Sequence, residues 1–413
     1  MFRKLLTLEQ AERAILKQFK PKPLGVEEIP LLEASKRVLA EEITSKIDIP
    51  AFDKSTVDGY AVRAADTFGA EENRPVTLKL CGTVNIGEIP ETVVRKKEAA
   101  EIVTGAPIPK GADAVVMVEQ TERKAGHIHV FSAVAKHGNI MKAGADIKKG
   151  ENVLKSGKLL GSREIGVLAA LGLARVRVYV VPKVAVLSTG AELTELGQSL
   201  SPGRVYDINA YSLSTAVFES GGKPIHLGVF QDNVIELQNA LKHALTSTDV
   251  VVTSGGVSIG PKDVMPKVLA FLGKPGVIVS GIAVKPGKPT TVALLSGKPV
   301  FSLPGHPTSA LLVFHLLVRP IIHLLAGRKV EKDLKVKAVA TARMFPAKGR
   351  KTFTMVTLKR NKSNRIIAQP VPDGDSGAIT TLAKADGFVE IPDNVQFVDA
   401  EEEVVVHLFR TGD

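Results

Sequence analysis

Three stretches of the chain combine glycine, hydroxyl side chains and an acid. They are STGAEL (188–193), YDINAYS (206–212) and TSGGVSIGPKD (253–263), with Glu192, Asp207 and Asp263 as their acids. Glycines let backbone N–H groups approach a phosphate, and Ser and Thr hydroxyls add donors. The acids would be explained by a Mg²⁺ ion that bridges carboxylates to the phosphate. The alternative is that Asp207 and Asp263 only cap the helices that follow them.

A second group of residues could hold a small anion. Lys285 and Lys288 flank a Pro-Gly turn, and Ser309 begins an apolar helical stretch. Proline stiffens the turn, so that two ammonium groups could be fixed around one ligand. Arg350 and Ser376, in the glycine-containing stretches GRKTF and GDSGAITTLAKADGF, are further candidates. The alternative is that the two lysines are simply solvated.

Several other chemistries are disfavoured by the sequence. The three loops contain neither GxxxxGK[ST] nor GxGxxG, which argues against nucleotide sites of those two types. There is no HExxH motif, and His306, His315 and His323 are too widely spaced for a compact ligand set. The single cysteine, Cys81, allows no intramolecular disulfide. It lies in a predicted strand, where we expect its side chain to contribute to packing and not to act as a nucleophile.

The loops must be positioned by the elements between them. From residue 183 to 271, apolar strands alternate with helices, which predicts a mostly parallel sheet with helices on both faces. Ligands of such sheets bind beyond the carboxyl ends of the strands, where all three loops are expected. The apolar stretch 309–327 contains His315, Arg319, Pro320 and His323, and therefore predicts a buried core helix, not a membrane span.

The rest of the chain divides into three further parts. Residues 5–45 predict two helices, the first begun by a capping box of Thr7 and Gln10. Short strands over 75–140 predict an inserted β-rich unit, and short strands again follow residue 328. The expected domains are 1–50 with 142–180 (a discontinuous N-terminal and linker domain), 51–141 (β-rich), 181–327 (α/β) and 328–413 (C-terminal β).

Composition narrows the class of protein. The 413 residues carry a formal net charge of +11, but the basic residues are dispersed and aromatics make up only 5%, so we expect no nucleic-acid partner. The N-terminal stretch lacks the apolar core of a signal peptide. Together with one cysteine, this predicts a cytoplasmic protein without a membrane partner.

Seven motifs, in order along the chain, carry a family resemblance. They are IPAFDKSTVDGYAVRAAD, EIVTGAPIPKGADAVVMVE, AGADIKKGE, VAVLSTGAEL, SGGVSIGPKD, VKPGKPT and LPGHPTSALL, across residues 49–312. Together they resemble the molybdopterin molybdenumtransferase family, which includes MoeA and the E domain of gephyrin. The resemblance implies a three-layer α/β molybdopterin-binding domain, an inserted β-rich domain, a discontinuous linker domain and a C-terminal β-barrel-like module.

The resemblance also implies an activity. Members of the family insert molybdate, or tungstate, at the dithiolene sulfurs of adenylated molybdopterin with the assistance of Mg²⁺, cleave the pyrophosphate and release AMP. The implied partners are a second copy of the chain, in a homodimer with shared active sites, and a molybdopterin adenylyltransferase. Two alternatives remain: the chain is itself such an adenylyltransferase, or it is a non-catalytic, gephyrin-like scaffold.

Matching the motifs assigns roles residue by residue. The implied catalytic residues are Asp58, Thr104, Asp146, Glu192, Asp207 and Asp263, of which Glu192, Asp207 and Asp263 would also bind the metal. Those that would bind molybdopterin are Ser188, Thr189, Gly190, Ser254, Gly255, Gly256, Pro304 and Pro307. The implied oxyanion-binding residues are Lys285, Lys288, Ser309, Arg350 and Ser376. The sequence departs from the common pattern at Ala191, where an acid is frequent, at His306, where an amide is frequent, and in GRKTF, which lacks the acid often found before its phenylalanine.

Overall fold

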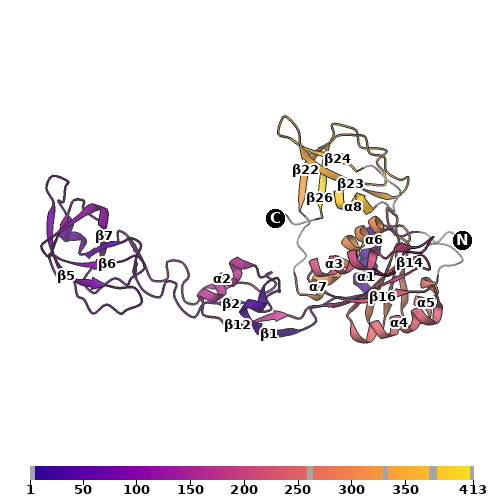
Figure 1. Ribbon diagram of the computed structural model, residues 1–413, viewed down its shortest axis with the longest axis horizontal. Coiled ribbons are helices and arrows are strands. Elements are labelled where there is room, and N and C mark those ends of the chain that lie inside the picture. The colour runs from indigo at the N-terminus through magenta and orange to yellow at the C-terminus, as the bar shows by residue number, and fades with distance from the viewer. Residues whose placement is uncertain (1–4, 258–263, 329–333, 372–378, 410–413) are drawn as a thin grey trace.

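The computed structural model describes residues 5–257, 264–328, 334–371 and 379–409, and shows an elongated chain (Figure 1). A β-rich domain lies at one end, and a smaller linker domain follows it. The α/β domain and a β-barrel lie side by side at the other end. This arrangement confirms the predicted multidomain α/β and β fold.

The α/β domain is built on a six-stranded sheet of order β16-β13-β17-β21-β20-β18. The first four strands are parallel, while β20 runs antiparallel to both of its neighbours. The sheet is therefore mostly parallel, as predicted. Its strands are β13 Lys183–Thr189, β16 Lys223–Phe230, β17 Val250–Ser254, β18 Gly276–Ser280, β20 Thr291–Leu295 and β21 Lys298–Leu303.

Helices cover both faces of this sheet, because the strands are apolar on both sides. On β17, Val250 and Val252 belong to the core cluster that contains residues of α1, α3, α6 and α7, whereas Val251 belongs to the cluster of α4 and α5. The helices are α1 Leu8–Phe19, α3 Asn209–Glu219, α4 Val234–Ser247, α5 Met265–Phe271, α6 Pro307–Val313 and α7 Arg319–Leu325.

Two features of residues 5–45 differ from the sequence prediction. Helix α1 has the predicted capping box, but Leu8, Ala11 and Ile15 pack into the core of the α/β domain and not into the linker domain. The second predicted helix is absent from the described residues 20–45. That segment forms strand β1 Val26–Pro30, a 3₁₀ turn and strand β2 Ile43–Thr44, because it pairs with distant strands of residues 152–179.

The described residues contain one helical stretch, Pro307–Leu325, that is long and apolar enough to cross a membrane by length and composition. It consists of α6, a π-helical turn Phe314–Val318 and α7. Within its most apolar window, 72% of the stretch is buried inside the protein. It packs as a core helix, as the sequence predicted.

The linker domain joins two separate segments of the chain. β1 pairs with β12 and β2 pairs with β11, so residues on both sides of the insertion share one small core. Its later elements are β11 Asn152–Leu154, α2 Ser162–Ala170 and β12 Arg175–Tyr179.

The inserted domain has a six-stranded sheet of order β7-β4-β6-β5-β9-β8 and a separate two-stranded pair, β3 with β10. Core clusters pack on both faces of the sheet. The strands are β3 Lys54–Ser55, β4 Gly59–Val62, β5 Val76–Val84, β6 Glu98–Ile102, β7 Ala114–Met117, β8 Thr121–Lys124, β9 His127–Val130 and β10 Ile140–Met141.

The C-terminal module is a closed barrel of five strands. The order β23-β24-β22-β26-β25 closes because β25 also pairs with β23. Its elements are β22 Lys335–Ala340, β23 Lys351–Arg360, β24 Ile366–Pro370, α8 Ile379–Lys384, β25 Gly387–Ile391 and β26 Glu403–Leu408. The exact domain boundaries expected from the sequence stay a prediction.

Candidate active site

Two of the three predicted loops are joined by hydrogen bonds. Strands β14 Leu193–Thr194 and β15 Val205–Tyr206 pair in parallel, and the N–H of Val205 donates to the carbonyl of Glu192 at 2.9 Å. The Ser188 hydroxyl, at the end of β13, donates to Asp207 Oδ1 at 2.9 Å. The loops 188–193 and 206–212 therefore meet at the carboxyl edge of the sheet, as the topology predicted.

Asp207 does more than cap a helix. Its Oδ1 accepts from the N–H of Ala210 at 3.1 Å, which stabilises the start of α3. Its Oδ2 is buried and has no hydrogen-bond partner among the described residues. A buried carboxylate oxygen without a donor costs about 1–3 kcal/mol, so a cation or a donor from a ligand would bind here favourably.

The third loop approaches so closely that only glycine fits. Gly255 has a φ of +94°, and a Cβ built on it would lie 2.0 Å from the carbonyl oxygen of Thr189. Its N–H donates to the carbonyl of Leu303 at 3.2 Å. The adjacent glycines noted in the sequence therefore allow the loop after β17 to lie against both neighbouring strand ends.

Asn209 connects the third loop to a fourth loop, residues 304–306, which follows β21. Its Nδ2 donates to Ser254 Oγ at 2.7 Å and to the carbonyl of Gly305 at 2.6 Å. Ser254 in turn donates to the carbonyl of Pro304 at 3.2 Å. Ser254 and Pro304 are thus brought together with Asp207, and Pro307 begins the helix that follows.

Thr189 and Glu192 complete the first loop. The Thr189 hydroxyl donates to Asp232 Oδ1 at 2.6 Å, which fixes its orientation. Glu192 is exposed, and its carboxylate folds over Gly190: a Cβ on that glycine would lie 2.8 Å from Glu192 Oε1. Two residues of the third loop remain. Gly256, beside Gly255, also has a positive φ, of +64°. Asp263 lies outside the described residues, so its predicted role stays a prediction.

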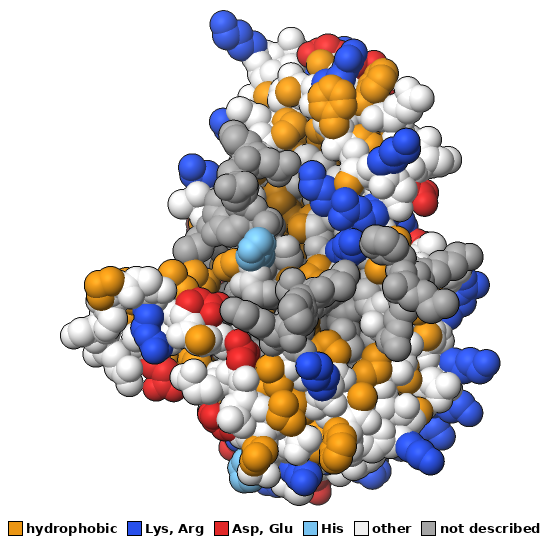
Figure 2. All heavy atoms as spheres, turned by 90° about the vertical axis from the view of Figure 1, so that its right-hand side faces the viewer, with side chains coloured by type: hydrophobic (Ala, Val, Ile, Leu, Met, Phe, Trp, Pro, Cys, Tyr) orange, Lys and Arg blue, Asp and Glu red, His pale blue; other side chains and the backbone are white. Residues whose placement is uncertain are grey.

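Lys285 and Arg350 come from different domains and meet at one junction. Strand β19 Val284–Lys285 pairs in parallel with the start of β23, with Lys285 in register with Thr352. Arg350 directly precedes β23. Figure 2 shows Lys and Arg side chains gathered on the face where the barrel meets the α/β domain. The pairing thus places the backbones of both predicted cations at the same strand junction.

Ser309 lies behind the same turn. It is buried on α6, and Gly287 of the KPGKP turn packs against that helix, where a Cβ would lie 2.5 Å from Val313 Cγ2. Lys288 is half-buried on the same turn. Ser376 lies outside the described residues, so its assignment is not tested.

Asp58 and Thr104 form a pair in the inserted domain. Asp58 Oδ1 accepts from the N–H of Thr104 at 2.6 Å and from its hydroxyl at 2.9 Å. These bonds lower the pKa of Asp58, the backbone N–H contributing most. Gly59 is required beside this pair, because a Cβ there would lie 1.9 Å from the carbonyl oxygen of Val116.

Within one chain, this pair is not brought to the α/β loops. The inserted domain and the α/β domain occupy opposite ends of the molecule in Figure 1. Asp146 is exposed, and its N–H donates to the carbonyl of Ile49 at 3.0 Å. The structure therefore separates Asp58 and Thr104 from the predicted residues of the α/β domain that it describes.

The described residues offer limited ligands for a metal. No three His, Cys, Asp or Glu side chains among them gather closely enough to hold an ion unaided. Mg²⁺, however, is commonly held by one or two carboxylates together with substrate phosphates. The unpartnered Oδ2 of Asp207, beside a glycine-rich loop, fits that mode of binding.

Two residues of the site were not singled out from the sequence. Asn209 joins two loops, and Asp232 orients Thr189. Asp232 lies two residues after the end of β16, so the rule that ligands bind at the carboxyl ends of strands would have found it. Asn209 lies in the predicted loop 206–212, but its role could not be read from the sequence, since its partners come from residues 254 and 305.

Family models match almost the whole chain. The MoeA N-terminal region (domain I and II) matches residues 6–172, a probable molybdopterin binding domain matches 185–324, and the MoeA C-terminal region (domain IV) matches 337–409. The three matches follow the order of the domains seen in the structure.

Individual relatives agree with these models. A molybdopterin molybdenumtransferase of Haemophilus influenzae is 37% identical over 98% of this chain and 99% of its own, and one of Bacillus subtilis is 33% identical over 92% and 89%. The crystal structure of a molybdopterin biosynthesis MoeA protein from Pyrococcus horikoshii superposes with a TM-score of 0.84 at 43% identity, covering 99% of this chain and all of that one. The fold, the loops and these likenesses together show that the chain belongs to the MoeA family of molybdopterin molybdenumtransferases, enzymes of molybdenum cofactor biosynthesis.

Proposed function

We propose that this enzyme inserts molybdate or tungstate into adenylated molybdopterin, cleaves the pyrophosphate and releases AMP. The observation that carries the proposal is the convergence of four loops around Asp207, whose buried Oδ2 has no partner among the described residues. A glycine-rich wall and an unsatisfied carboxylate suit a phosphate substrate that arrives with a divalent cation.

Asp207 would hold Mg²⁺, together with Asp263 and, after rotation of its side chain, Glu192. When bound, the ion would neutralise charge on the pyrophosphate. The chain's own contribution is orientation: Ser188 fixes Asp207 Oδ1, and Asn209 fixes the loop of Ser254. The hydroxyls and glycines of residues 188–190 and 254–256 would then hold the phosphates and the pterin.

The oxyanion would bind at the junction between the α/β domain and the barrel. Lys285 and Arg350 are held there by the pairing of β19 with β23. Cations with hydroxyl donors such as Ser309 form charge-assisted hydrogen bonds with a tetrahedral oxyanion. Lys288 and Ser376 complete the proposed set.

The active site would be shared between two copies of the chain. Asp58 and Thr104 lie in the inserted domain, far along the molecule from Asp207 (Figure 1). A homodimer that places this domain against the partner's α/β domain would join the two groups. The substrate would come from a molybdopterin adenylyltransferase, and we place the reaction in the cytoplasm.

One incubation tests the proposal. The protein is mixed with adenylated molybdopterin, Mg²⁺ and molybdate, and AMP and metal-loaded cofactor are quantified together. We expect both products, in equal amounts. An adenylyltransferase would give neither product here and would instead consume ATP in a separate incubation with free molybdopterin. A scaffold would be inactive in both incubations. AMP release that does not depend on molybdate would contradict the proposed coupling.

A further inference from the structure

Three segments from distant parts of the sequence meet behind Lys285 and Arg350. Leu6 forms a parallel bridge with Ile282, and its carbonyl accepts from the N–H of Ala283 at 2.7 Å. The carbonyl of Ala283 accepts from the N–H of Lys351 at 3.0 Å. The N-terminal segment, the entry to the KPGKP turn and barrel strand β23 thus form one hydrogen-bonded ladder.

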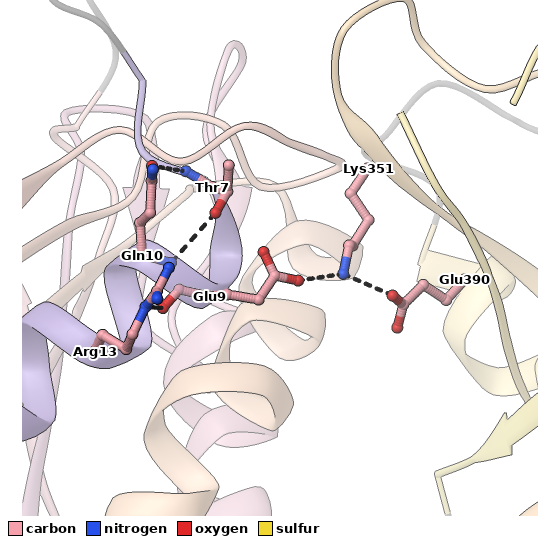
Figure 3. A network of polar contacts seen from close by, with 6 residues as sticks. All are labelled: Thr7, Glu9, Gln10, Arg13, Lys351 and Glu390. Atoms are coloured by element: carbon pink, nitrogen blue, oxygen red, sulfur yellow. Dashed lines mark hydrogen bonds and ion pairs between the residues drawn. The ribbon is translucent and has the colours of Figure 1, made fainter. Parts of the chain in front are cut away.

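The side chain of Lys351 adds a second connection across this junction (Figure 3). Its ammonium group binds Glu9 on α1 and, at 2.7 Å, Glu390 on β25. Glu9 is held in the first turn of α1, which Thr7 and Gln10 fix through their reciprocal capping bonds. One lysine therefore joins a helix of the α/β domain to two strands of the barrel.

The contacts of this cluster favour the charged forms of Lys351 and Glu9. Burial disfavours the Lys351 ammonium, but its hydrogen bonds to Glu390 and Glu9 outweigh that effect and raise its pKa. The hydrogen bond to Lys351 lowers the pKa of Glu9. One ammonium between two carboxylates carries a net negative charge, so this cluster is not itself a place for an anion.

We propose that Lys351 is a positioning residue for the oxyanion site: through Glu9 and Glu390 it holds β23 against β19, so that Arg350 and Lys285 contact the same ligand. The inference rests on the proposed function, because it takes these two cations as the ligands of the oxyanion. Arg350 directly precedes Lys351, and Lys285 is one residue beyond Val284, the register partner of Lys351. A small shift of β23 would therefore move the two cations apart.

Stability alone does not explain the arrangement. Partly exposed ion pairs contribute little to the free energy of unfolding, and the Glu9 side chain is 52% exposed. Loss of the cluster should therefore leave the protein folded while it changes the local geometry. Effects of this kind appear in ligand affinity, since a site of two cations depends on their separation.

The test measures molybdate affinity by calorimetry, without turnover. We expect Lys351→Met, Glu9→Gln and Glu390→Gln each to weaken binding by roughly fivefold or more, the range seen for residues coupled in one network. Lys351→Arg, which can still bind both acids, should remain within about twofold of wild type. The double variant Lys351→Met with Glu9→Gln should bind molybdate as tightly as Lys351→Met alone, because both substitutions break the same contact.

The Gln variants separate positioning from direct binding. Removing a negative charge near an anion site should by simple electrostatics strengthen binding. If Glu9→Gln and Glu390→Gln bind molybdate as well as or better than wild type while Lys351→Met binds it worse, then Lys351 is itself a ligand and the positioning role is wrong.

Matched controls come from another ion pair of the barrel. Lys337 and Glu403 pair at 2.7 Å between β22 and β26. Lys337→Met and Glu403→Gln make the same charge changes and should leave affinity unchanged, and melting temperatures should confirm that all variants are folded. Lys285→Met tests the site itself: if it does not weaken binding, the proposed oxyanion site is wrong. If it does and Lys351→Met does not, only the present inference fails.

Discussion

Asp207 accepts a hydrogen bond from Ser188 through Oδ1, while its buried Oδ2 has no partner in the described part of the chain. Half of this carboxylate is therefore committed to structure, and half is open to a ligand. The sequence posed these roles as alternatives, a helix cap or a metal ligand. The geometry allows both at once, one for each oxygen.

Asp207→Asn should separate the two roles. The amide oxygen can still accept from Ser188 and Ala210, so we expect a folded protein with a nearly unchanged melting temperature. The lost charge should lower AMP release by about 100-fold or more. Asp249→Asn is a matched control, because Asp249 accepts from the backbone of Lys183 at the opposite edge of the sheet. Equal turnover by Asp207→Asn and wild type would show that this acid is only a cap.

Complementation between subunits should occur if the site is shared. An Asp58→Ala chain lacks the inserted-domain group, and an Asp207→Asn chain lacks the α/β group. Mixed dimers contain one complete site, so activity should return to about one quarter of wild type when subunits exchange randomly and each dimer has two sites. Native mass spectrometry checks the exchange. Inactive mixtures with verified heterodimers would show that each chain completes its own site.

Thr104→Val should raise the pKa of Asp58 towards its ordinary value. The hydroxyl bond is lost, but the stronger backbone bond remains, so the change should be partial. Because the folded pKa of Asp58 is lowered, its stabilising contribution is present above the ordinary value of 3.8 and is lost as pH falls through the folded pKa. The stability of the Thr104→Val variant should therefore change less with pH in the acid range than that of the wild type. NMR titration of the Asp58 carboxyl carbon measures the shift, and an unchanged pKa would contradict the hydroxyl's role.

Gly255→Ala should disrupt the loop after β17. A methyl group would meet the carbonyl oxygen of Thr189 at 2.0 Å, in addition to the strain of a φ of +94°. We expect destabilisation of about 3 kcal/mol or more, measured by urea unfolding. Gly203→Ala is the control: its φ is +80°, but no atom lies within 4 Å of the added carbon, so it should cost only about 1 kcal/mol. Similar losses for both would mean that contact with Thr189 is unimportant.

Molybdate and tungstate should bind with affinities within about tenfold of each other, or roughly 1.4 kcal/mol. The two ions have the same charge and shape, and Lys285, Ser309 and Arg350 would offer both the same donors. Calorimetric titration with each ion measures the ratio. A larger gap would point to selectivity from a further residue such as His306, which precedes α6.

Much of this protein was determined by its sequence because the signals are local. Alternating apolar strands and helices specify the mostly parallel sheet, and the rule for strand ends predicts that the three loops meet at one edge, as their described residues do. Thr7 and Gln10 specify the start of α1 through contacts three residues apart. The motifs of 49–312 then indicated the family, which the comparisons confirmed.

Other features depend on contacts between residues far apart in sequence, and only the tertiary structure decided them. Residues 26–30, expected only as a connection between two helices, form a strand because residues 175–179 offer a pairing edge. Helix α1 buries its apolar face, with Leu8 and Ile15, against the sheet of the α/β domain. Lys351 binds Glu9, which lies 342 positions away in the sequence, and Glu390, which lies 39 positions away. Asn209 likewise joins residues 254 and 305. Such side chains carry no local signal, since their partners become neighbours only when the sheet and the barrel have formed.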